Sequence, residues 1–490
     1  MDHKVSAAVI EASTPAAPPV YGLLVNGQWI EGAGPRISAR DKYKLQPCAT
    51  VTTADAAQVR QAVDVAHAAF RAGAPVAYER GLVLDRAAQL LEARAPEFVR
   101  TMQLEAGFTQ SDALGEVRRC IQTLKLSAEE ARRLVGDVIP LAGAPGAAGR
   151  MGFTIRVPLG VVAAITPFNS PLNTVTHKVA PAFAAGNAVI LKPSSYTPLT
   201  ACLLAEVLLE AGMPKGFLSV LHGSAEVVRN LQADERVRFF AFTGSTEVGR
   251  QIQQAAGLRR TQMELGSIAC TILCDDAKLD AALPKVVNAG FRKAGQVCTS
   301  VQLLLVHESL LGEVEKRLAP LVQELPCGDP QDPKTFVGPV ISEDNAIRIE
   351  SWINEAIASG AKRLAGGPRQ GAVVPPTLLT NIGDSMKVGC CEIFGPVVAI
   401  VPFQTLAQAI ARVNATPFGL ATGIFTNRLN DALAASQQLE VGGVHINETS
   451  SSRVDLMPYG GSKDSGFGRE GPHYAVHEMT EERIVTFTTI

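Results

Sequence analysis

Residues 239–256 read FFAFTGSTEVGRQIQQAA, and this stretch decides the fold class. The apolar run 239–242 predicts a buried strand, and the amphipathic spacing of residues 247–256 predicts a helix. The turn between them holds Gly244 and Ser245, and Gly249 follows in the helix. A helix that begins directly after a buried strand is the building unit of an α/β fold.

The same alternation continues on the N-terminal side of this stretch. Further strands are predicted over 161–165, 188–191 and 218–221, with helices over 200–211 and 225–232. Apolar strands that alternate with helices form a parallel sheet covered on both faces. We therefore expect a doubly wound, Rossmann-like domain. A helical pattern also covers about 54–134.

A second α/β region is expected from about residue 271. It has strands over 301–306 and 397–402 and helices over 309–325 and 343–359. Residues 138–150 are rich in Pro and Gly and predict a loop or an extended excursion. The alternating C-terminal segment 482–490 predicts a strand that could pair with another subunit. Residues 1–19 are rich in Ala and Pro and are expected to be disordered.

Composition excludes several classes of protein. The chain has 490 residues, 47% of them hydrophobic, and a net charge of −2. This charge gives no support for nucleic acid or an anionic membrane as a partner. Nine cysteines without a CxxC pair indicate reduced thiols. No signal peptide and no long apolar run are found, so we expect a cytoplasmic protein without a transmembrane helix.

Two strand ends carry candidate ligand-binding residues. Ser245 stands at a helix start, where free N–H groups favour a phosphate, although a tight turn alone explains the pattern equally well. Lys192 ends the strand 188–191, at the sheet edge where α/β folds bind ligands. Taken alone, an ordinary surface lysine is the simpler interpretation.

Three further residues are candidates for catalysis. Cys298 lies in GQVCTS and is either a nucleophile or a buried inert thiol. Glu264 lies between Met and Leu, where partial desolvation would raise its pKa toward that of a useful base, unless it points to water. Asn169 lies between two prolines and either donates to an oxyanion or caps a turn. The pair His473 and His477 lacks further ligands, so no metal site is expected.

The combination and order of these motifs indicate a family more specifically than any single motif does. The chain resembles the aldehyde dehydrogenase superfamily over about residues 20–490. The matching segments are PFNSPL, KVAPAFAAGNAVILKPS, FTGSTEVG, MELG, GQVCTS, EIFGP and PYGGSKDSGFGREG.

The resemblance implies a role for each matching residue. Cys298 would attack the aldehyde carbon, and Asn169 with the Cys298 backbone N–H would form the oxyanion hole. Glu264 would activate the water that hydrolyses the thioester, with Lys178 and Glu470 as a proton relay behind it. The residues implied in NAD or NADP binding are Thr166, Phe168, Lys192, Ser194, Ser195, Phe242, Gly244, Ser245, Leu265, Gly266, Glu392 and Phe394. Among them, Lys192 would contact the adenosine ribose, Ser245 the diphosphate, and Glu392 the nicotinamide ribose.

The chain departs from the family pattern at informative positions. Many NAD-specific members have Glu where this chain has Ser195, and a Glu would repel a 2′-phosphate. We therefore expect NADP to be accepted, with NAD still possible. Ser267 replaces a more usual glycine, and its Cβ could restrict the movement of Glu264.

The substrate is expected to be a small polar or anionic aldehyde. The segment around Arg453 resembles lactaldehyde-like and phosphonoacetaldehyde-like members, and Arg453 either pairs with a substrate anion or forms a structural salt bridge. Val297 stands where phosphate-binding members often have Arg, which argues against a phosphorylated substrate.

The expected organisation has three parts. An NAD(P)-binding domain covers 20–137 and 157–267, a catalytic domain covers 268–466, and a small β oligomerisation element combines 138–156 with 467–490. The resemblance implies a homodimer or a homotetramer. Two rivals remain. A CoA-acylating semialdehyde dehydrogenase is disfavoured by Glu264, and a catalytically silent scaffold is disfavoured by the joint presence of Cys298, Glu264 and Asn169.

Overall fold

The computed structural model describes residues 6–11 and 17–489, and its largest sheet has eight strands in the order β23-β13-β12-β9-β10-β11-β3-β4. The five strands β13 to β11 in this order run parallel, while β23, β3 and β4 are antiparallel to their neighbours. The strands are β3 (Leu23–Val25), β4 (Gln28–Ile30), β9 (Val161–Ile165), β10 (Ala188–Lys192), β11 (Leu218–Val220), β12 (Val237–Thr243), β13 (Arg260–Glu264) and β23 (Gly466–Phe467).

The strand order indicates where this sheet can bind a ligand. The chain runs outward from β9 through β10 to β11, then returns to the other side of β9 with β12 and β13. The connections after β9 and β12 therefore diverge, and a crevice forms between them at the carboxyl ends of the strands. Thr166 and Gly244 follow these two strands directly. The predicted Rossmann-like fold is confirmed.

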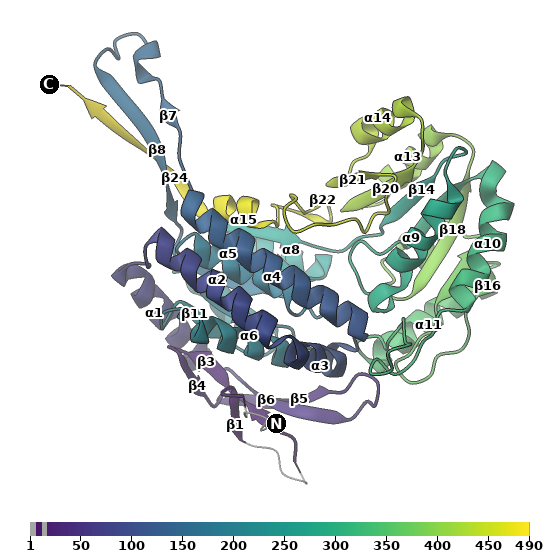
Figure 1. The fold of residues 1–490 in the computed structure, drawn as a ribbon, viewed down its shortest axis with the longest axis horizontal. Coiled ribbons are helices and arrows are strands. Elements are labelled where there is room, and N and C mark those ends of the chain that lie inside the picture. The colour runs from purple at the N-terminus through teal and green to yellow at the C-terminus, as the bar shows by residue number, and fades with distance from the viewer. Residues whose placement is uncertain (1–5, 12–16, 490) are drawn as a thin grey trace.

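Helices cover both faces of this sheet (Figure 1). One group packs together as a layer: α2 (Ala77–Ala93), α3 (Ala95–Ala106), α4 (Gln110–Arg133), α5 (Asn173–Ala184), α6 (Pro198–Glu210) and α15 (Pro472–Glu478). The other group is α1 (Ala56–Ala72), α7 (Ala225–Ala233) and α8 (Thr246–Ala256). Helix α5 is buried along its whole length between the sheet and α4. Its polar residues Asn173, His177 and Lys178 are buried with partners, at Asp455 for the first two and at Glu470 for Lys178.

A second sheet has seven strands in the order β16-β17-β18-β15-β14-β20-β21, all parallel except β16. Alternate residues of β15 face two different cores: Leu304 and Val306 pack on one side, and Leu303 and Leu305 pack on the other. The strands are β14 (Cys270–Leu273), β15 (Leu303–His307), β16 (Lys362–Ala365), β17 (Thr377–Thr380), β18 (Val397–Phe403), β20 (Ala421–Phe425) and β21 (Gly443–Ile446). The helices are α9 (Leu279–Phe291), α10 (Leu311–Gln323), α11 (Glu343–Ala358), α12 (Lys387–Cys390), α13 (Leu406–Asn414) and α14 (Leu429–Gln438).

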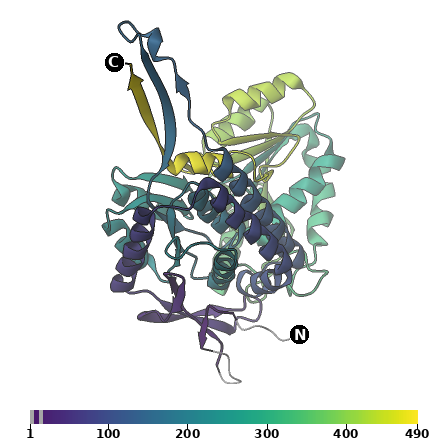
Figure 2. The same ribbon diagram turned by 60° about the vertical axis from the view of Figure 1, so that its left-hand side comes forward.

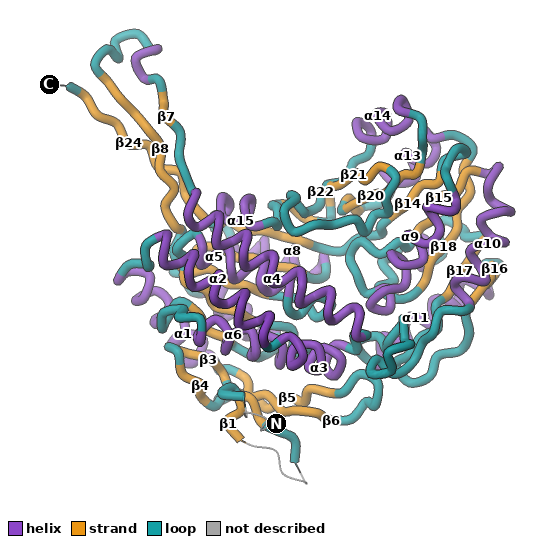
Figure 3. Tube along the Cα trace, viewed as in Figure 1, coloured by secondary structure: helices purple, strands orange, loops and turns teal. Residues whose placement is uncertain are grey.

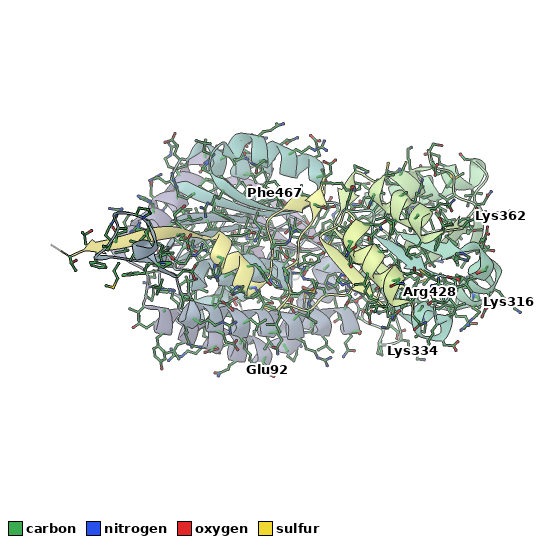
Figure 4. All side chains as sticks on the ribbon, turned by 90° about the horizontal axis from the view of Figure 1, so that it is seen from above. Glu92, Lys316, Lys334, Lys362, Arg428 and Phe467 are labelled. Atoms are coloured by element: carbon green, nitrogen blue, oxygen red, sulfur yellow. The ribbon has the colours of Figure 1, made fainter. Side chains whose placement is uncertain are left out.

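The two α/β units lie side by side. Figure 4 shows Glu92 and Phe467 on one unit and Lys316 and Lys362 on the other. Phe467 belongs to β23, so the chain returns from the second unit to the edge of the first sheet at Gly466, the last residue of the predicted catalytic domain. The short strands β19 (Phe418–Gly419) and β22 (Ser462–Lys463) pair along this return.

An antiparallel arm projects from the first unit (Figure 2). It consists of β7 (Val138–Ile139), β8 (Arg150–Pro158) and β24 (Thr480–Thr488), with β8 in the middle. Helix α15, which the sequence grouped with this element, packs instead on α4 and α5. Figure 3 shows that the connection between β7 and β8 is mostly loop, as its Pro and Gly content indicates.

A four-stranded sheet precedes the first unit: β1 (Val9–Glu11), β2 (Val20–Tyr21), β5 (Gly34–Arg40) and β6 (Pro47–Thr53). The expected disorder of residues 1–19 is therefore wrong for Val9–Glu11, which pair with β2. This segment is anchored because the Ala8 N–H donates to Glu206 Oε1 at 2.9 Å, a long-range contact that composition does not reveal. Residues 1–5 and 12–16 of that prediction lie outside the described residues.

No helix in the described part of the chain is long and apolar enough to cross a membrane. All nine cysteines are free thiols.

Candidate active site

A cavity of about 790 Å³ lies where the two units meet. It is lined by the ends of β9, β10, β12 and β13 and by the turn that carries Cys298. The predicted site residues that line it are Thr166, Phe168, Asn169, Lys192, Ser194, Ser195, Phe242, Gly244, Ser245, Glu264, Leu265, Gly266, Val297, Cys298, Glu392, Phe394 and Arg453. Lys178 and Glu470 do not line the cavity and are buried behind it.

The turn before Cys298 has an unusual backbone. Lys293, Ala294 and Gly295 have φ of 52°, 53° and 68°, in the left-handed region that costs a non-glycine residue of the order of 1–2 kcal/mol. Side-chain contacts compensate this strain. Lys293 Nζ lies 2.6 Å from Glu116 Oε1 on α4 and also donates to the Asn169 backbone oxygen at 3.1 Å. One ammonium therefore joins the Cys298 turn to the Asn169 turn.

The Cys298 thiol lies between a phenol and a carboxyl group. Its Sγ is 2.7 Å from the Tyr459 hydroxyl. Burial, and then the nearby Glu264, raise the pKa of the Cys298 thiol well above its ordinary value. The resting thiol is therefore protonated, and forming the nucleophilic thiolate requires a base and compensating donors.

Glu264 ends β13 and is 3% exposed. Burial, and then the charge of Glu470, raise the pKa of the Glu264 carboxyl above its ordinary value. Its Oε1 has no hydrogen-bond partner among the described residues. An unpartnered buried carboxyl group with a raised pKa, in a cavity with a thiol, is what a general base requires.

Two donors near the thiol are free. Asn169 lines the cavity, and its side-chain amide makes no hydrogen bond to any described residue. The backbone N–H of Cys298 is likewise unpaired within residues 17–489. Both groups belong to turns that Lys293 joins.

Glu470 lies behind Glu264, and two cations neutralise the negative charge of the Glu470 carboxylate. Lys178 Nζ is 3.0 Å from Oε1, and Arg453 Nη2 is 2.8 Å from Oε2. Burial alone would raise the pKa of the Glu470 carboxyl, but Lys178 and Arg453 hold that pKa well below its usual range. The predicted relay pair is thus in contact, as a buried ion pair.

The other end of the cavity suits a dinucleotide. Thr166 Oγ1 is buried without a hydrogen-bond partner, and the Lys192 ammonium donates to no described residue, although the Lys192 backbone oxygen accepts from the Thr166 N–H. Burial lowers the pKa of the Lys192 ammonium to about 8. Ser245 precedes α8 and its side chain does not cap the helix, so the first N–H groups of α8 stay free for a phosphate.

The Glu392 carboxyl group is held by a hydrogen bond from the backbone of Ser267. The Ser267 N–H donates to its Oε1 at 2.8 Å, so the position that departs from the family glycine anchors this carboxyl group. Burial raises the pKa of Glu392 to about 7. A Cβ on Gly266 would lie 2.9 Å from Glu392 Oε2, which shows how closely the backbone and this carboxyl group approach. These residues fit the predicted NAD or NADP.

The lining residues that the sequence analysis missed include Glu116, Arg292, Lys293 and Tyr459. Arg292 and Lys293 stand within six residues of Cys298, and their charge beside a nucleophile motif was a signal that could have identified them. Tyr459 lies in the matching segment PYGGSKDSGFGREG, although no role was assigned to it, whereas Glu116 comes from a distant segment and carries no local signal. No group of three or more potential metal ligands occurs among the described residues.

Comparison with known proteins identifies the family. The model of the aldehyde dehydrogenase family matches residues 29–485. A 3-sulfolactaldehyde dehydrogenase of Priestia aryabhattai is 46% identical over 466 residues, which cover 95% of this chain and 97% of that protein.

Two solved structures extend this similarity to the fold. Aldehyde dehydrogenase 21 of Physcomitrella patens, in complex with the reaction product succinate, has a TM-score of 0.94 and 38% identity, covering 96% and 99% of the two chains. An NADP-dependent enzyme of E. coli has a TM-score of 0.92 and 34% identity, covering 96% and 98%. The chain therefore belongs to the aldehyde dehydrogenase family, the NAD(P)-dependent oxidoreductases that act on aldehydes.

Proposed function

We propose that this chain oxidises a small anionic aldehyde to its carboxylic acid through a thioester on Cys298. The observation that carries the proposal is the joint placement of Cys298, Glu264 and Asn169 in one cavity whose other end suits a dinucleotide. The anionic character of the substrate rests on Arg292.

In the first step, Glu264 accepts the thiol proton and the Cys298 sulfur attacks the aldehyde carbon. The carbonyl electron pair moves to oxygen, where the Asn169 amide and the Cys298 N–H donate to it. NAD(P)+, when bound against Lys192, Ser245 and Glu392, supplies the hydride acceptor. The carbon then remains attached to Cys298 as a thioester.

In the second step, Glu264 takes a proton from water, whose oxygen adds to the thioester carbon. The carbon–sulfur bond breaks with its electron pair on sulfur, and the carboxylic acid leaves. A base in this position favours water over CoA as the acyl acceptor. We propose, as the family resemblance implies, that the proton leaves Glu264 along a relay that includes Lys178 and Glu470. Because both groups are charged in their ion pair, Lys178 can accept a proton only after it has passed one on.

Arg292 is a cation near the nucleophile that forms no salt bridge with a described carboxylate. Its guanidinium lines the cavity and donates to Ser451 Oγ at 2.7 Å, and no described carboxylate forms a salt bridge with it. By contrast, Arg119 makes a bidentate pair with Asp455 (2.7 and 3.2 Å), and Arg453 pairs with Glu470. Buried charges in proteins are normally paired, so an unpaired guanidinium in a cavity is available to a substrate anion.

The relatives suggest which anion this is. The names 3-sulfolactaldehyde and succinate denote a sulfonate and a dicarboxylate, each carrying an anionic group at the end remote from the oxidised carbon. A guanidinium binds either group through two hydrogen bonds. We infer that the substrate has three or four carbons and ends in a sulfonate or a carboxylate.

The test compares matched aldehydes. NAD(P)H formation is followed with 3-sulfolactaldehyde against lactaldehyde, and with succinate semialdehyde against butanal. We expect a higher kcat/KM for the anionic member of at least one pair, and no turnover in Cys298→Ala. Turnover retained in Cys298→Ala would refute the mechanism.

A substitution assigns the selectivity to one residue. Arg292→Gln should lower kcat/KM for the preferred anionic aldehyde about tenfold or more beyond any loss for its neutral partner, because a hydrogen bond to a charged group contributes roughly 1.5–3 kcal/mol. Arg363→Gln, an exposed arginine on β16, is the matched control. Equal losses for both aldehydes in Arg292→Gln would show that Arg292 does not recognise the anion.

We also propose that NADP is accepted. Ser195 donates to the Gly223 backbone oxygen at 3.3 Å and presents no charge to a 2′-phosphate. Ser224, which begins α7, and Arg229 line the same end of the cavity. A hydroxyl, a helix start and a guanidinium together suit a phosphate.

The projecting arm supports self-association as a homodimer or homotetramer. Its solvent-facing side chains include Met151, Ile484 and Phe487, exposed by 67%, 52% and 53%. Apolar residues on an isolated sheet indicate an interface, and a second copy of this chain offers the same strand edge. Light scattering of the wild type against Phe487→Asp tests this: a monomer in both would refute the assembly.

A further inference from the structure

Tyr459 is fixed beside the nucleophile by the backbone. Its N–H donates to the Glu470 carbonyl at 3.0 Å, and the Glu470 N–H donates back to the Tyr459 carbonyl at 2.7 Å. This isolated bridge joins the loop after β21 to the segment before α15. The ring is buried, and the Arg453 guanidinium carbon lies 3.7 Å from its centroid. Tyr459 therefore has little freedom to turn away from Cys298.

The phenol oxygen lies 2.7 Å from Cys298 Sγ, which is a direct hydrogen bond to the reacting atom. Burial, and then the neighbouring Cys298 and Glu264, raise the pKa of the Tyr459 hydroxyl well above its ordinary value. The hydroxyl therefore keeps its proton at neutral pH. Toward a thiolate, which has no hydrogen to give, Tyr459 can only be the donor.

The sulfur needs such a donor because its surroundings oppose its charge. Burial and Glu264 on β13 disfavour the thiolate, while Arg453 on the loop after β21 and Arg292 in the preceding turn favour it. Arg453 is already shared with Glu470. Tyr459 supplies the direct hydrogen bond to sulfur in the described structure.

We propose that Tyr459 is a further catalytic residue, which donates its phenolic hydrogen to Cys298 sulfur whenever that sulfur carries negative charge. This happens twice, assuming the thioester mechanism proposed above. Before attack, the hydrogen bond stabilises the thiolate, and it weakens as the sulfur–carbon bond forms. During hydrolysis, the carbon–sulfur bond breaks and sulfur receives the electron pair, so the hydrogen bond forms again. The Tyr459 proton is never transferred.

The test measures thiol reactivity without any aldehyde. The rate of Cys298 alkylation by iodoacetamide is followed from pH 6 to 10 in the full-length protein, with the modified peptide identified by mass spectrometry. Tyr459→Phe keeps the ring and its contact with Arg453 but removes the hydroxyl. We expect the thiol titration to move to higher pH, and alkylation at pH 7.5 to slow by about tenfold or more. Tyr78→Phe, which removes an exposed hydroxyl on α2, should match the wild type.

Two results would overturn the proposal: an unchanged pH profile in Tyr459→Phe, or a shift to lower pH. A site-specifically incorporated fluorotyrosine at position 459, a stronger donor of the same shape, should shift the profile to lower pH and covers the case in which Tyr459→Phe does not fold. Failure of the proposed function is distinguishable, because it would leave turnover intact in Cys298→Ala whatever the alkylation profile.

Discussion

Arg453 and Glu470 form a buried ion pair, with 2.8 Å between Nη2 and Oε2. The sequence leaves two roles open for Arg453, a structural salt bridge and the binding of a substrate anion. The pair with Glu470 is the structural salt bridge. The pair does not exclude the substrate role, because Arg453 also lines the cavity and its Nε has no partner among the described residues. It does mean that part of the charge of Arg453 is neutralised before any substrate binds.

Arg453 and Arg292 should therefore differ in their effect on selectivity. Arg453→Met disturbs Glu470 and the ring of Tyr459, so kcat/KM should fall by about tenfold or more for succinate semialdehyde and butanal alike. Arg292→Gln should lower the value for the anionic aldehyde more than the value for butanal. The measurement is the ratio of the two kcat/KM values in each variant. A ratio that collapses in Arg453→Met and persists in Arg292→Gln would assign the anion to Arg453.

Glu264→Gln should separate oxidation from hydrolysis. Without its base, the enzyme should release about one NAD(P)H per active site in a burst and then turn over at least about 100-fold more slowly than the wild type. The burst itself should also be slower than in the wild type, because Glu264 accepts the thiol proton in the first step. In the wild type, the raised pKa of Glu264 means that the basic form is lost as pH falls, at a pH above the ordinary carboxyl range. Stopped-flow absorbance at 340 nm measures both. Restoration of steady turnover by added CoA would instead identify an acylating enzyme.

The sequence predicted those parts of the site that lie within one local stretch of strand, turn and helix. The pattern of strand, turn and helix at 239–256 placed Gly244 and Ser245 at the carboxyl edge of the sheet, and the structure has them there. Contacts between distant segments carry no periodic signal. Lys293 contacts Glu116, which is 177 residues away in the sequence, and Tyr459 contacts Cys298, which is 161 residues away. Nor could spacing reveal that Lys293 takes a left-handed backbone conformation.

Cofactor binding should depend on pH near neutrality. The Glu392 carboxyl, with its pKa raised to about 7, accepts hydrogen bonds from a ribose best when ionised. The ionised form exists above this pH, so kcat/KM for the cofactor should rise through about pH 7 and level off above it. The free-enzyme profile reports this group. Glu392→Gln should lower the plateau and remove the inflection, and an inflection that survives in this variant would belong to another group.

The preference between cofactors should respond to one substitution. Ser195→Glu places a carboxylate at the end of the cavity that holds Arg229, where it would repel a 2′-phosphate. We expect kcat/KM for NADP to fall by about tenfold or more and the value for NAD to stay within about threefold. Ser195→Gln, of similar size without the charge, is the control. A wild type that strongly prefers NAD would refute the acceptance of NADP from the outset.

Lys293 should matter for both stability and rate. Lys293→Met leaves Glu116, 1% exposed, without the cation 2.6 Å away, and breaking a buried pair costs about 3–5 kcal/mol. The exposed pair of Lys285 and Glu448 offers a matched control, and Lys285→Met should cost about 1 kcal/mol or less. Urea denaturation measures the two changes. Because Lys293 also donates to Asn169 at 3.1 Å, kcat should fall even where the variant remains folded. Full activity in folded Lys293→Met would show that the Asn169 turn holds its position alone.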